Sequence, residues 1–414
     1  MLDSRRGRRV AIVAGVRTPF VKSGTVFRDV SAVTLARHAS RELLYRSGVD
    51  GREVDEVIFS QVVPSAVTPN VAREVSLLPQ LPPSVPAYTL NRACASAAQA
   101  INNASDQILL GHSDAIIAGG VESLSDIPIL HSRRFSQTLV DASKARSLGS
   151  RMAVISRVRP RDLVPVTPAI AEPSTGETMG QSAEKMAKEN GISREEQDRL
   201  ALMSHQRAAA ATADGRLTAE IAPWFSGPDM DQVITADNGV RSDTSLDALA
   251  KLKPVFAAKG SVTAGNSSQT SDGAAAVVVM SREKADALGL KPIARFLSFA
   301  VGGVPPELMG IGPVVAVPKA LKLAGLTMED IDLIELNEAF AAQAIAVIRA
   351  LEMDEEKVNV NGGAIALGHP LGCSGAKLTV QILHELKRRG GRYGLVTMCV
   401  GGGQGAAGVI ERLG

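Results

Sequence analysis

Reactive side chains stand beside small residues in widely separated stretches of this chain. Cys94 lies in NRACASAAQA and Cys399 lies in CVGGGQGAA, so each thiol has neighbours that leave room for a substrate. His369 lies in ALGHPLGCSG, and Asn337 begins NEAF. An imidazole can take the proton of a thiol, and a side-chain amide can donate to an oxyanion. Together these side chains predict acyl transfer through a covalent thioester.

Cys94 is the expected nucleophile. The apolar run PAYTL before it is typical of a strand and a helical pattern starts at Cys94, so we expect the thiol at a helix N-terminus. The positive end of the helix dipole would then lower the thiol pKa from its ordinary value of about 8.5. A buried structural cysteine is the alternative for a single thiol, and the accompanying motifs favour the catalytic interpretation.

The other reactive groups follow from their positions. His369 is the only one of six histidines in a loop rich in Gly and Pro, so we expect it to activate Cys94. Asn337 ends a strand pattern and can donate to an oxyanion, cap the next helix, or do both, one by its backbone and the other by its side chain. Cys399 precedes glycines, where a thiol can move a proton at a carbon next to a carbonyl and Gly401 can offer its backbone N–H. The third thiol, Cys373, is expected to be structural.

The composition excludes several function classes. The length of 414 residues suggests two or three domains. A net charge of +2 and an aromatic content of 3% argue against nucleic-acid binding. Three cysteines cannot all pair within the chain, which suits a reducing compartment, and the early apolar run AIVAGV is too short for a signal-peptide core. We therefore expect a cytoplasmic protein without a membrane span.

Strand and helix patterns alternate at both ends of the chain, which predicts an α/β fold with helices on both sheet faces. The two ends are also alike, because an aspartate follows both Gly48 and Gly325 by seven residues and begins a similar apolar run. We interpret this likeness as an internal duplication. The segment 123–269 is irregular and polar, with a helical pattern at 193–213, and is interpreted as an insertion that carries binding. The strand patterns cover 9–14, 56–59, 114–118, 274–280, 331–336, 393–399 and 406–410, and the helical patterns cover 94–110, 314–324, 338–351 and 373–389.

The motifs quoted above resemble the thiolase family over nearly the whole chain. The resemblance implies duplicated βαβαβαββ halves that form a layered α-β-α-β-α core, with a large loop-domain insertion. The N-terminal half would cover 1–122 and be completed by 270–290. A loop domain at 123–269 would bind coenzyme A and the acyl group, and the C-terminal half would cover 291–414.

The resemblance also implies a role for each reactive residue. Cys94 takes the acyl group, His369 activates it, and Cys399 is the acid and base at the α-carbon. One oxyanion hole combines Asn337, through a water, with His369, and the other uses the backbone N–H groups of Cys94 and Gly401. Coenzyme A and acyl-CoA are substrates, and no permanently bound cofactor or metal is implied. The expected coenzyme A contacts are Met179, Arg241, Phe256, Ala264, Ser268 and Phe340.

Short stretches of the sequence indicate which type of thiolase the chain resembles. ACASAAQA and STGETMGQSAEKMA resemble the β-subunits of fatty-acid oxidation complexes, whereas NEAF points to the wider family because those β-subunits often carry His in place of Asn337. The expected activity is that of a 3-ketoacyl-CoA thiolase in β-oxidation. The alternatives are a short-chain acetoacetyl-CoA thiolase and a non-catalytic lipid-binding or scaffold protein. A ketoacyl synthase would carry a histidine at Asn337, and a hydroxymethylglutaryl-CoA synthase would carry a glutamate at Cys399.

The resemblance further implies assembly. A homodimer or a dimer of dimers is expected, together with a partner subunit that carries hydratase and dehydrogenase activities. Residues 131–161 contain eight basic residues and one acid, Asp141. This run is either a solvated basic face or a docking surface for the partner, for anionic lipid in a peripheral membrane contact, or for the phosphates of coenzyme A.

Overall fold

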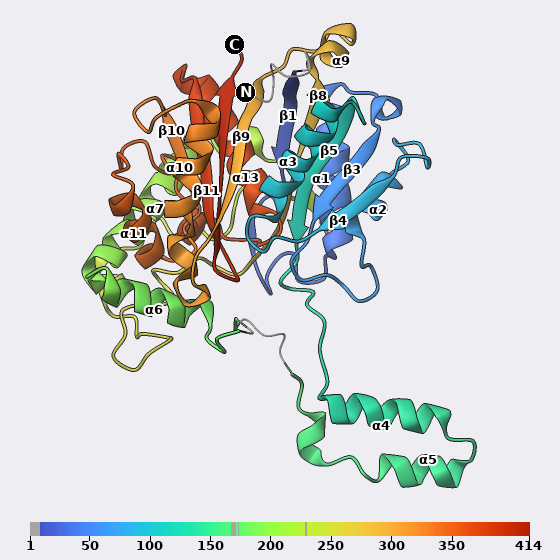
Figure 1. Ribbon diagram of the computed structural model, residues 1–414. Helices are drawn as coiled ribbons and strands as arrows, with labels where there is room; N and C mark the ends of the chain where they lie inside the picture. The colour runs from blue at the N-terminus through green and yellow to red at the C-terminus, as the bar shows by residue number, and fades with distance from the viewer. Residues whose placement is uncertain (1–8, 167–170, 173, 228–229) are drawn as a thin grey trace.

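The computed structural model describes residues 9–166, 171–172, 174–227 and 230–414, and its core is a ten-stranded sheet with helices on both faces (Figure 1). In the N-terminal half the strand order is β1-β8-β5-β3-β4. The pairs β1–β8 and β8–β5 are antiparallel, and the pairs β5–β3 and β3–β4 are parallel. These strands are β1 (Val10–Arg17), β3 (Glu56–Ser60), β4 (Ala87–Leu90), β5 (Ala115–Glu122) and β8 (Ser271–Ser281), and β2 (Val21–Lys22) pairs with β8.

The C-terminal half repeats this plan. Its order is β9-β12-β11-β10, with the same change from antiparallel to parallel pairing, and a parallel bridge between Ile334 and Val358 stands where β4 stands in the first half. The halves meet where Ile12 pairs with Ala294. The repeated order confirms the predicted duplication. The strands are β9 (Ala294–Gly303), β10 (Leu333–Leu336), β11 (Tyr393–Val400) and β12 (Gln404–Arg412).

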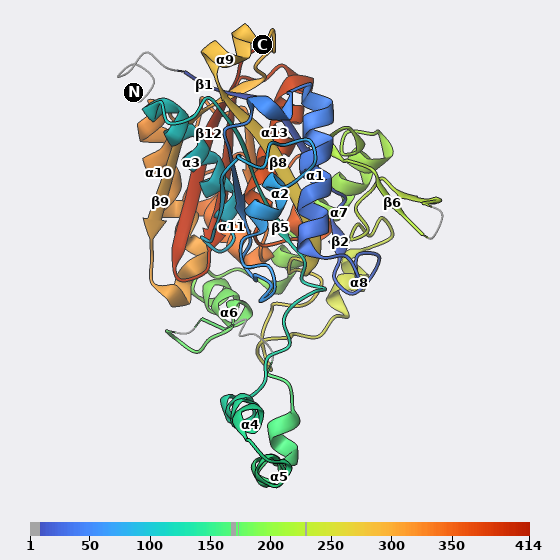
Figure 2. The same cartoon turned by 90° about the vertical axis from the view of Figure 1, so that its right-hand side faces the viewer.

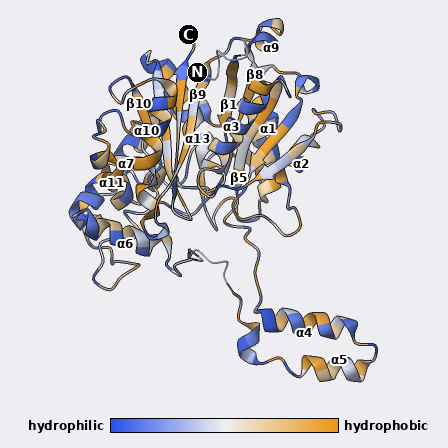
Figure 3. Cartoon of the chain, in the orientation of Figure 1, coloured by the Kyte–Doolittle hydropathy of each residue, from blue (hydrophilic) through white to orange (hydrophobic). Residues whose placement is uncertain are grey.

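Alternating apolar side chains divide the protein into the five expected layers. In β5, Ile116 faces a central core and Ile117 faces an outer one, as the two-residue period of a strand requires. The central core holds α3 (Ser96–Leu110) and α13 (Ser374–Arg389) between the half-sheets, and Gly375 lets α13 approach the backbone of α3 closely. The outer cores hold α1 (Ala32–Ser47) and α2 (Val71–Ser76) on one side, and α10 (Gly312–Ala324) and α11 (Ala341–Ala350) on the other (Figures 2 and 3).

The insertion is more helical than the sequence predicts. Two helices, α4 (Arg133–Lys144) and α5 (Leu148–Ile155), are capped by Ser132 and Ser147 and form a hairpin that stands away from the body (Figure 1). The irregular interpretation of this stretch is therefore wrong, because serine N-caps define two short helices within a polar sequence. No described helix is long and apolar enough to cross a membrane. The remaining elements are α6 (Met179–Glu189), α7 (Arg194–Ala213), α8 (Leu246–Ala250), α9 (Arg282–Ala287), α12 (Ala364–Leu367), β6 (Trp224–Ser226) and β7 (Gln232–Ile234).

Candidate active site

Cys94 lies in a tight turn between β4 and α3. The sequence predicted that Cys94 opens the helix. The helix instead begins at Ser96 with Ala95 as its N-cap, so the thiol lies just before it. Ala93 adopts a left-handed conformation with φ of 42°, which costs a residue with a side chain about 1 kcal/mol or more. Asn91 accepts the N–H of Ala93 at 2.8 Å, and the Ser96 hydroxyl donates to the Ala93 carbonyl at 2.5 Å. These bonds hold the strained turn.

His369 lies within reach of the thiol. Its Nε2 is 3.3 Å from the sulfur of Cys94, and its Nδ1 is 2.6 Å from the hydroxyl of Ser374. That hydroxyl donates its proton to the Pro370 carbonyl at 3.0 Å, so it must accept from Nδ1–H. The network therefore assigns the proton to Nδ1 and leaves Nε2 free to act as a base. Ser374 was missed in the sequence, where SG after a cysteine indicates only a tight turn.

Asn337 completes this cluster from the end of β10. Its Nδ2 lies 3.3 Å from Nε2 of His369, and its backbone N–H donates to the Thr397 carbonyl at 3.0 Å. The following helix, α11, starts at Ala341 and has Phe340 as its N-cap, with no side-chain capping bond. The capping alternative for Asn337 is therefore wrong, and its amide is available to the site.

Burial controls the protonation states of the pair. It raises the pKa of the Cys94 thiol to about 11, the Glu122 carboxylate adds to the rise, and the N–H groups of Gly401 and Cys94 oppose it. The expected lowering of the thiol pKa is wrong, because burial raises it and the N–H groups only reduce the rise. Burial also lowers the pKa of His369 to about 4, so the imidazole is neutral at pH 7 and can accept a proton. Both groups are therefore neutral at pH 7, with Nε2 of His369 within hydrogen-bonding distance of the thiol.

The second thiol lies close to the first. Cys399, at 1% exposure, is the penultimate residue of β11; burial raises its pKa above the ordinary range, and the charge of Cys94 raises it further. Both effects favour the protonated form of the Cys399 thiol at neutral pH. Cys373 is buried at the N-terminus of α13, where burial also raises its pKa. Its position outside the cluster agrees with a structural role.

A buried carboxylate that the sequence did not single out supports the loop of His369. Glu122 ends β5 and accepts backbone N–H groups from Val62, Val63 and Gly372 at 3.0, 3.1 and 2.9 Å. Burial raises its pKa to about 7. These bonds join the first half of the sheet to the loop that carries His369. In the sequence, the only sign of this role is an acidic residue at the end of a buried strand pattern. That pattern does not show which backbone N–H groups the carboxylate binds.

Four of the expected coenzyme A residues gather beside Cys399. Met179 and Phe340 pack against an apolar cluster that contains Cys399. The ring of Phe256 stands edge-on to Phe340, with centroids 6.1 Å apart. The Ser268 N–H donates to the Ala339 carbonyl at 3.0 Å. Aromatic and thioether side chains at this place form an apolar wall suited to a pantetheine or acyl chain.

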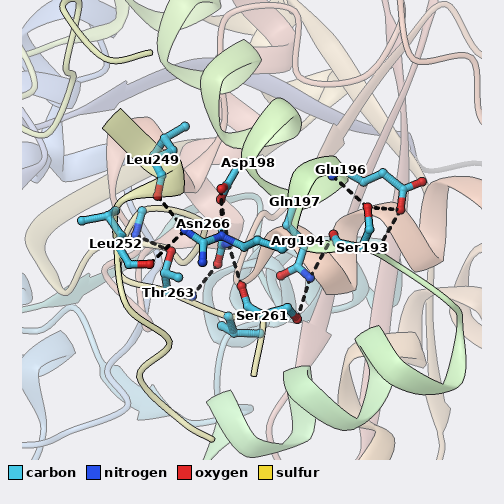
Figure 4. Close-up of polar contacts among 12 residues, drawn as sticks. Ser193, Arg194, Glu196, Gln197, Asp198, Leu249, Leu252, Ser261, Thr263 and Asn266 are labelled. Carbon is cyan, nitrogen blue, oxygen red and sulfur yellow. Dashed lines mark hydrogen bonds and ion pairs between the residues drawn. The ribbon is translucent and has the colours of Figure 1, made fainter. Parts of the chain in front are cut away.

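The loop of Ser268 is held by α7, as Figure 4 shows. The amide of Asn266 donates to Asp198 at 2.9 Å, and that of Gln197 donates to Ser261 at 2.9 Å. Two further expected residues stand apart from the apolar wall. Ala264 is exposed on this loop, and Arg241 is exposed with its backbone N–H bound to Nδ1 of His205 at 3.1 Å.

Known families match this chain from end to end. The model of the thiolase N-terminal domain matches residues 10–283, and that of the thiolase C-terminal domain matches residues 290–412. The chain belongs to the thiolase family. This thiolase is 49% identical to a 3-ketoacyl-CoA thiolase of Bacillus subtilis, over 98% of this chain and 99% of that one.

Solved thiolases share its fold. An acetyl-CoA acetyltransferase of Bacillus anthracis superposes with a TM-score of 0.88 at 39% identity, over 98% of this thiolase and 99% of that chain. Human mitochondrial 3-ketoacyl-CoA thiolase in complex with CoA superposes with a TM-score of 0.87 at 39% identity, over 98% of both chains. The fold class and the family implied by the sequence motifs are thereby confirmed, and the family makes the chain an acyltransferase.

Proposed function

We propose that this thiolase is a 3-ketoacyl-CoA thiolase, an acyl-CoA:acetyl-CoA C-acyltransferase that cleaves 3-ketoacyl-CoA with coenzyme A and can run in the reverse Claisen direction. One observation carries the proposal: Cys94 has its own base in His369, while a second, protonated thiol lies beside it. Acyl loading and carbon–carbon cleavage need separate proton transfers, and this site supplies both. The names of the relatives support the same substrate class.

In the first half-reaction, the sulfur of Cys94 attacks the 3-keto carbon while its proton passes to His369. The resulting oxyanion is held by N–H donors, for which we propose the backbone N–H groups of Cys94 and Gly401. The bond between C2 and C3 then breaks, and its electron pair leaves as the enolate of acetyl-CoA. Cys399 protonates the α-carbon and becomes a thiolate, so acetyl-CoA departs and an acyl group remains on Cys94.

In the second half-reaction, coenzyme A restores the enzyme. The Cys399 thiolate takes the proton of the incoming thiol, which attacks the acyl thioester. The tetrahedral intermediate then expels the sulfur of Cys94, and the imidazolium of His369 returns its proton. The shortened acyl-CoA leaves, and both thiols are protonated as before.

Two reactive thiols need a reducing compartment, which supports our proposal that the enzyme is cytoplasmic.

A thiolysis assay tests this function. With coenzyme A and a series of 3-ketoacyl-CoA substrates of rising length, the enzyme should release acetyl-CoA and an acyl-CoA shortened by two carbons. We expect kcat/KM of about 10⁴ M⁻¹s⁻¹ or more for substrates longer than acetoacetyl-CoA. Cleavage of acetoacetyl-CoA alone would favour the short-chain alternative. Absence of thiolysis across the series would favour the non-catalytic alternative.

The edge strand β4 supports assembly with a second copy. It closes one end of the sheet, and its residues Ala87–Leu90 are only partly buried. An open strand edge pairs readily with another chain. We therefore propose that the enzyme is a homodimer or a dimer of dimers.

The helical hairpin of α4 and α5, with the flanking residues to 161, is named the arm here. Its basic residues are exposed, and Leu148 and Met152 expose 76% and 60% of their surface. Helices of this length are marginal alone in water, and a mixed apolar and basic face is typical of a surface that a partner covers. We propose that the arm docks on a subunit with hydratase and dehydrogenase activities.

Charge removal tests the arm. Replacing Arg157, Arg159 and Arg161 by Ser should weaken binding to a purified subunit of this kind by about tenfold at low salt, because screened attraction is lost. The measurement is titration calorimetry at low and moderate salt, with vesicles containing phosphatidylglycerol in parallel. Thiolysis should keep its kcat and KM.

The control removes equal charge from the body by replacing the exposed Lys291, Lys319 and Lys322 with Ser. It should bind like the parent. Equal binding by the arm variant would reduce the arm to a solvated basic face. Loss of vesicle binding alone would assign it to anionic lipid instead of a protein partner.

A further inference from the structure

The turn that carries Gly401 lacks stiffness of its own. Residues Gly401–Gly403 join β11 to β12, and we call them the glycine turn. Gly402 and Gly403 have φ of 83° and 74°, in the left-handed region that glycine tolerates without strain. Consecutive glycines also allow a peptide plane to rotate easily. The pairing of Val400 with Gln404 closes the base of the turn, and bonds from outside it add constraints on its peptides.

The orientation matters because the turn faces the nucleophile. The N–H of Gly401 points at the sulfur of Cys94, and the nearest atom to a side chain at Gly401 would be the Cβ of Ala93. A donor in this position can bind an oxyanion on the carbonyl that Cys94 attacks only if its peptide keeps its direction. Rotation of the next peptide plane would disturb that direction.

Bonds from outside reach the turn at two of its residues. The Val304 N–H donates to the Gly403 carbonyl at 2.7 Å. From the insertion, the Glu172 carboxylate accepts the N–H of Gly402 at 2.8 Å. The Arg92 guanidinium holds the residue after the turn by donating to the Gln404 side chain at 3.0 Å. Among the described residues, the bond from Gly402 to Glu172 is the contact from outside the turn that holds the peptide between Gly401 and Gly402. A charged acceptor makes it stronger than an ordinary amide bond.

Glu172 is itself held in place. Its backbone N–H donates to the Glu177 carbonyl at 2.7 Å, and its carbonyl accepts the N–H of Gly176 at 2.8 Å. Its second carboxylate oxygen accepts the Ser174 hydroxyl at 3.4 Å. Residue Met179 of the apolar wall begins α6 shortly after Glu177. The backbone of Glu172 is thus held by hydrogen bonds while its carboxylate contacts the catalytic turn.

We propose that Glu172 is a positioning residue for the reaction: it locks the peptide between Gly401 and Gly402 and so keeps the N–H of Gly401 aimed at the acyl carbonyl on Cys94. This inference rests on the proposed thiolase function and assigns part of its oxyanion site to the insertion.

Three variants test the proposal by single-turnover acylation of Cys94. Glu172→Ala should slow loading about tenfold, less than loss of an oxyanion donor itself, with KM within about twofold of the parent. Glu172→Gln keeps an acceptor oxygen on the same stem and should recover most of the rate. Glu177→Ala removes the neighbouring carboxylate, which pairs with Lys185 at 2.6 Å, and should load like the parent.

Hydrogen exchange of the peptide around 398–404 provides a second measurement. Glu172→Ala should exchange faster there than the parent, and Glu177→Ala should not. Parent-like loading and exchange in Glu172→Ala would overturn the proposal, as would equal slowing by Glu177→Ala, since the loop as a whole would then be responsible. If the parent itself fails to load Cys94, the proposed function fails, while exchange still reports on the bond to Gly402.

Discussion

Replacing Cys94 with Ser should lower thiolysis by about three orders of magnitude or more. A hydroxyl is a far weaker nucleophile than a thiol at neutral pH, and His369 cannot make up the difference. The strained turn should persist, because its bonds come from Asn91 and Ser96 and not from the thiol. The measurement is kcat/KM for thiolysis, together with mass spectrometry of the parent after brief incubation with acetyl-CoA.

The label in that experiment should lie on the peptide that carries Cys94. Cys373→Ala is the matched control, since it removes a buried thiol outside the cluster, and it should keep its activity within a few-fold of the parent. A stable acyl label on Cys399 or Cys373 would contradict the assignment. So would a Cys94→Ser variant that turns over at the parental rate.

The sequence predicted which side chains meet, because thiol, imidazole and amide chemistry stands out against small neighbours. Cys94, His369 and Asn337 are indeed brought together from distant segments. The sequence could not predict their protonation. Position at a helix N-terminus suggested a lowered thiol pKa, whereas burial within the folded site raises it. Desolvation depends on atoms from the whole fold, and no local pattern reports it.

Supporting residues were missed for a related reason. Ser374 and Glu122 act through hydrogen bonds to His369 and to the loop around it, and such bonds link residues far apart in the chain. Glu172 is a stronger case, since its partner Gly402 lies 230 positions away. In the sequence, a glutamate in a polar insertion is expected to be an ordinary solvated surface residue. Only the folded backbone shows which N–H it meets.

The fold itself was largely predictable, with instructive exceptions. Continuous apolar runs such as β8, buried along its whole length, indicated strands covered on both faces. The strand β9 was missed because ARFLSFAVGG alternates with partly exposed residues and contains an arginine. The arm was read as irregular because its two short helices have almost no buried face. Apolar periodicity finds elements that bury a core and overlooks elements that do not.

The second large effect separates the two thiols. Cys399→Ala should abolish carbon–carbon cleavage and condensation, with a loss of about three orders of magnitude, and should still allow acyl transfer from acetyl-CoA to Cys94. The reason is that the α-carbon receives its proton from Cys399, whereas loading from a simple thioester uses only Cys94 and His369. Burial keeps the Cys399 thiol protonated until that step, since it raises the pKa above its ordinary range.

Two assays on one preparation distinguish the steps. Exchange of labelled coenzyme A with acetyl-CoA follows loading, and thiolysis of a 3-ketoacyl-CoA follows carbon–carbon cleavage. In Cys399→Ala, covalent label on Cys94 should form while thiolysis is lost, and exchange should fall less than thiolysis because only deprotonation of the incoming thiol is impaired. Equal loss of labelling and cleavage would mean that Cys399 supports the nucleophile itself. Retained cleavage would mean that another group reaches the α-carbon, and the division of labour between the two thiols would have to be abandoned.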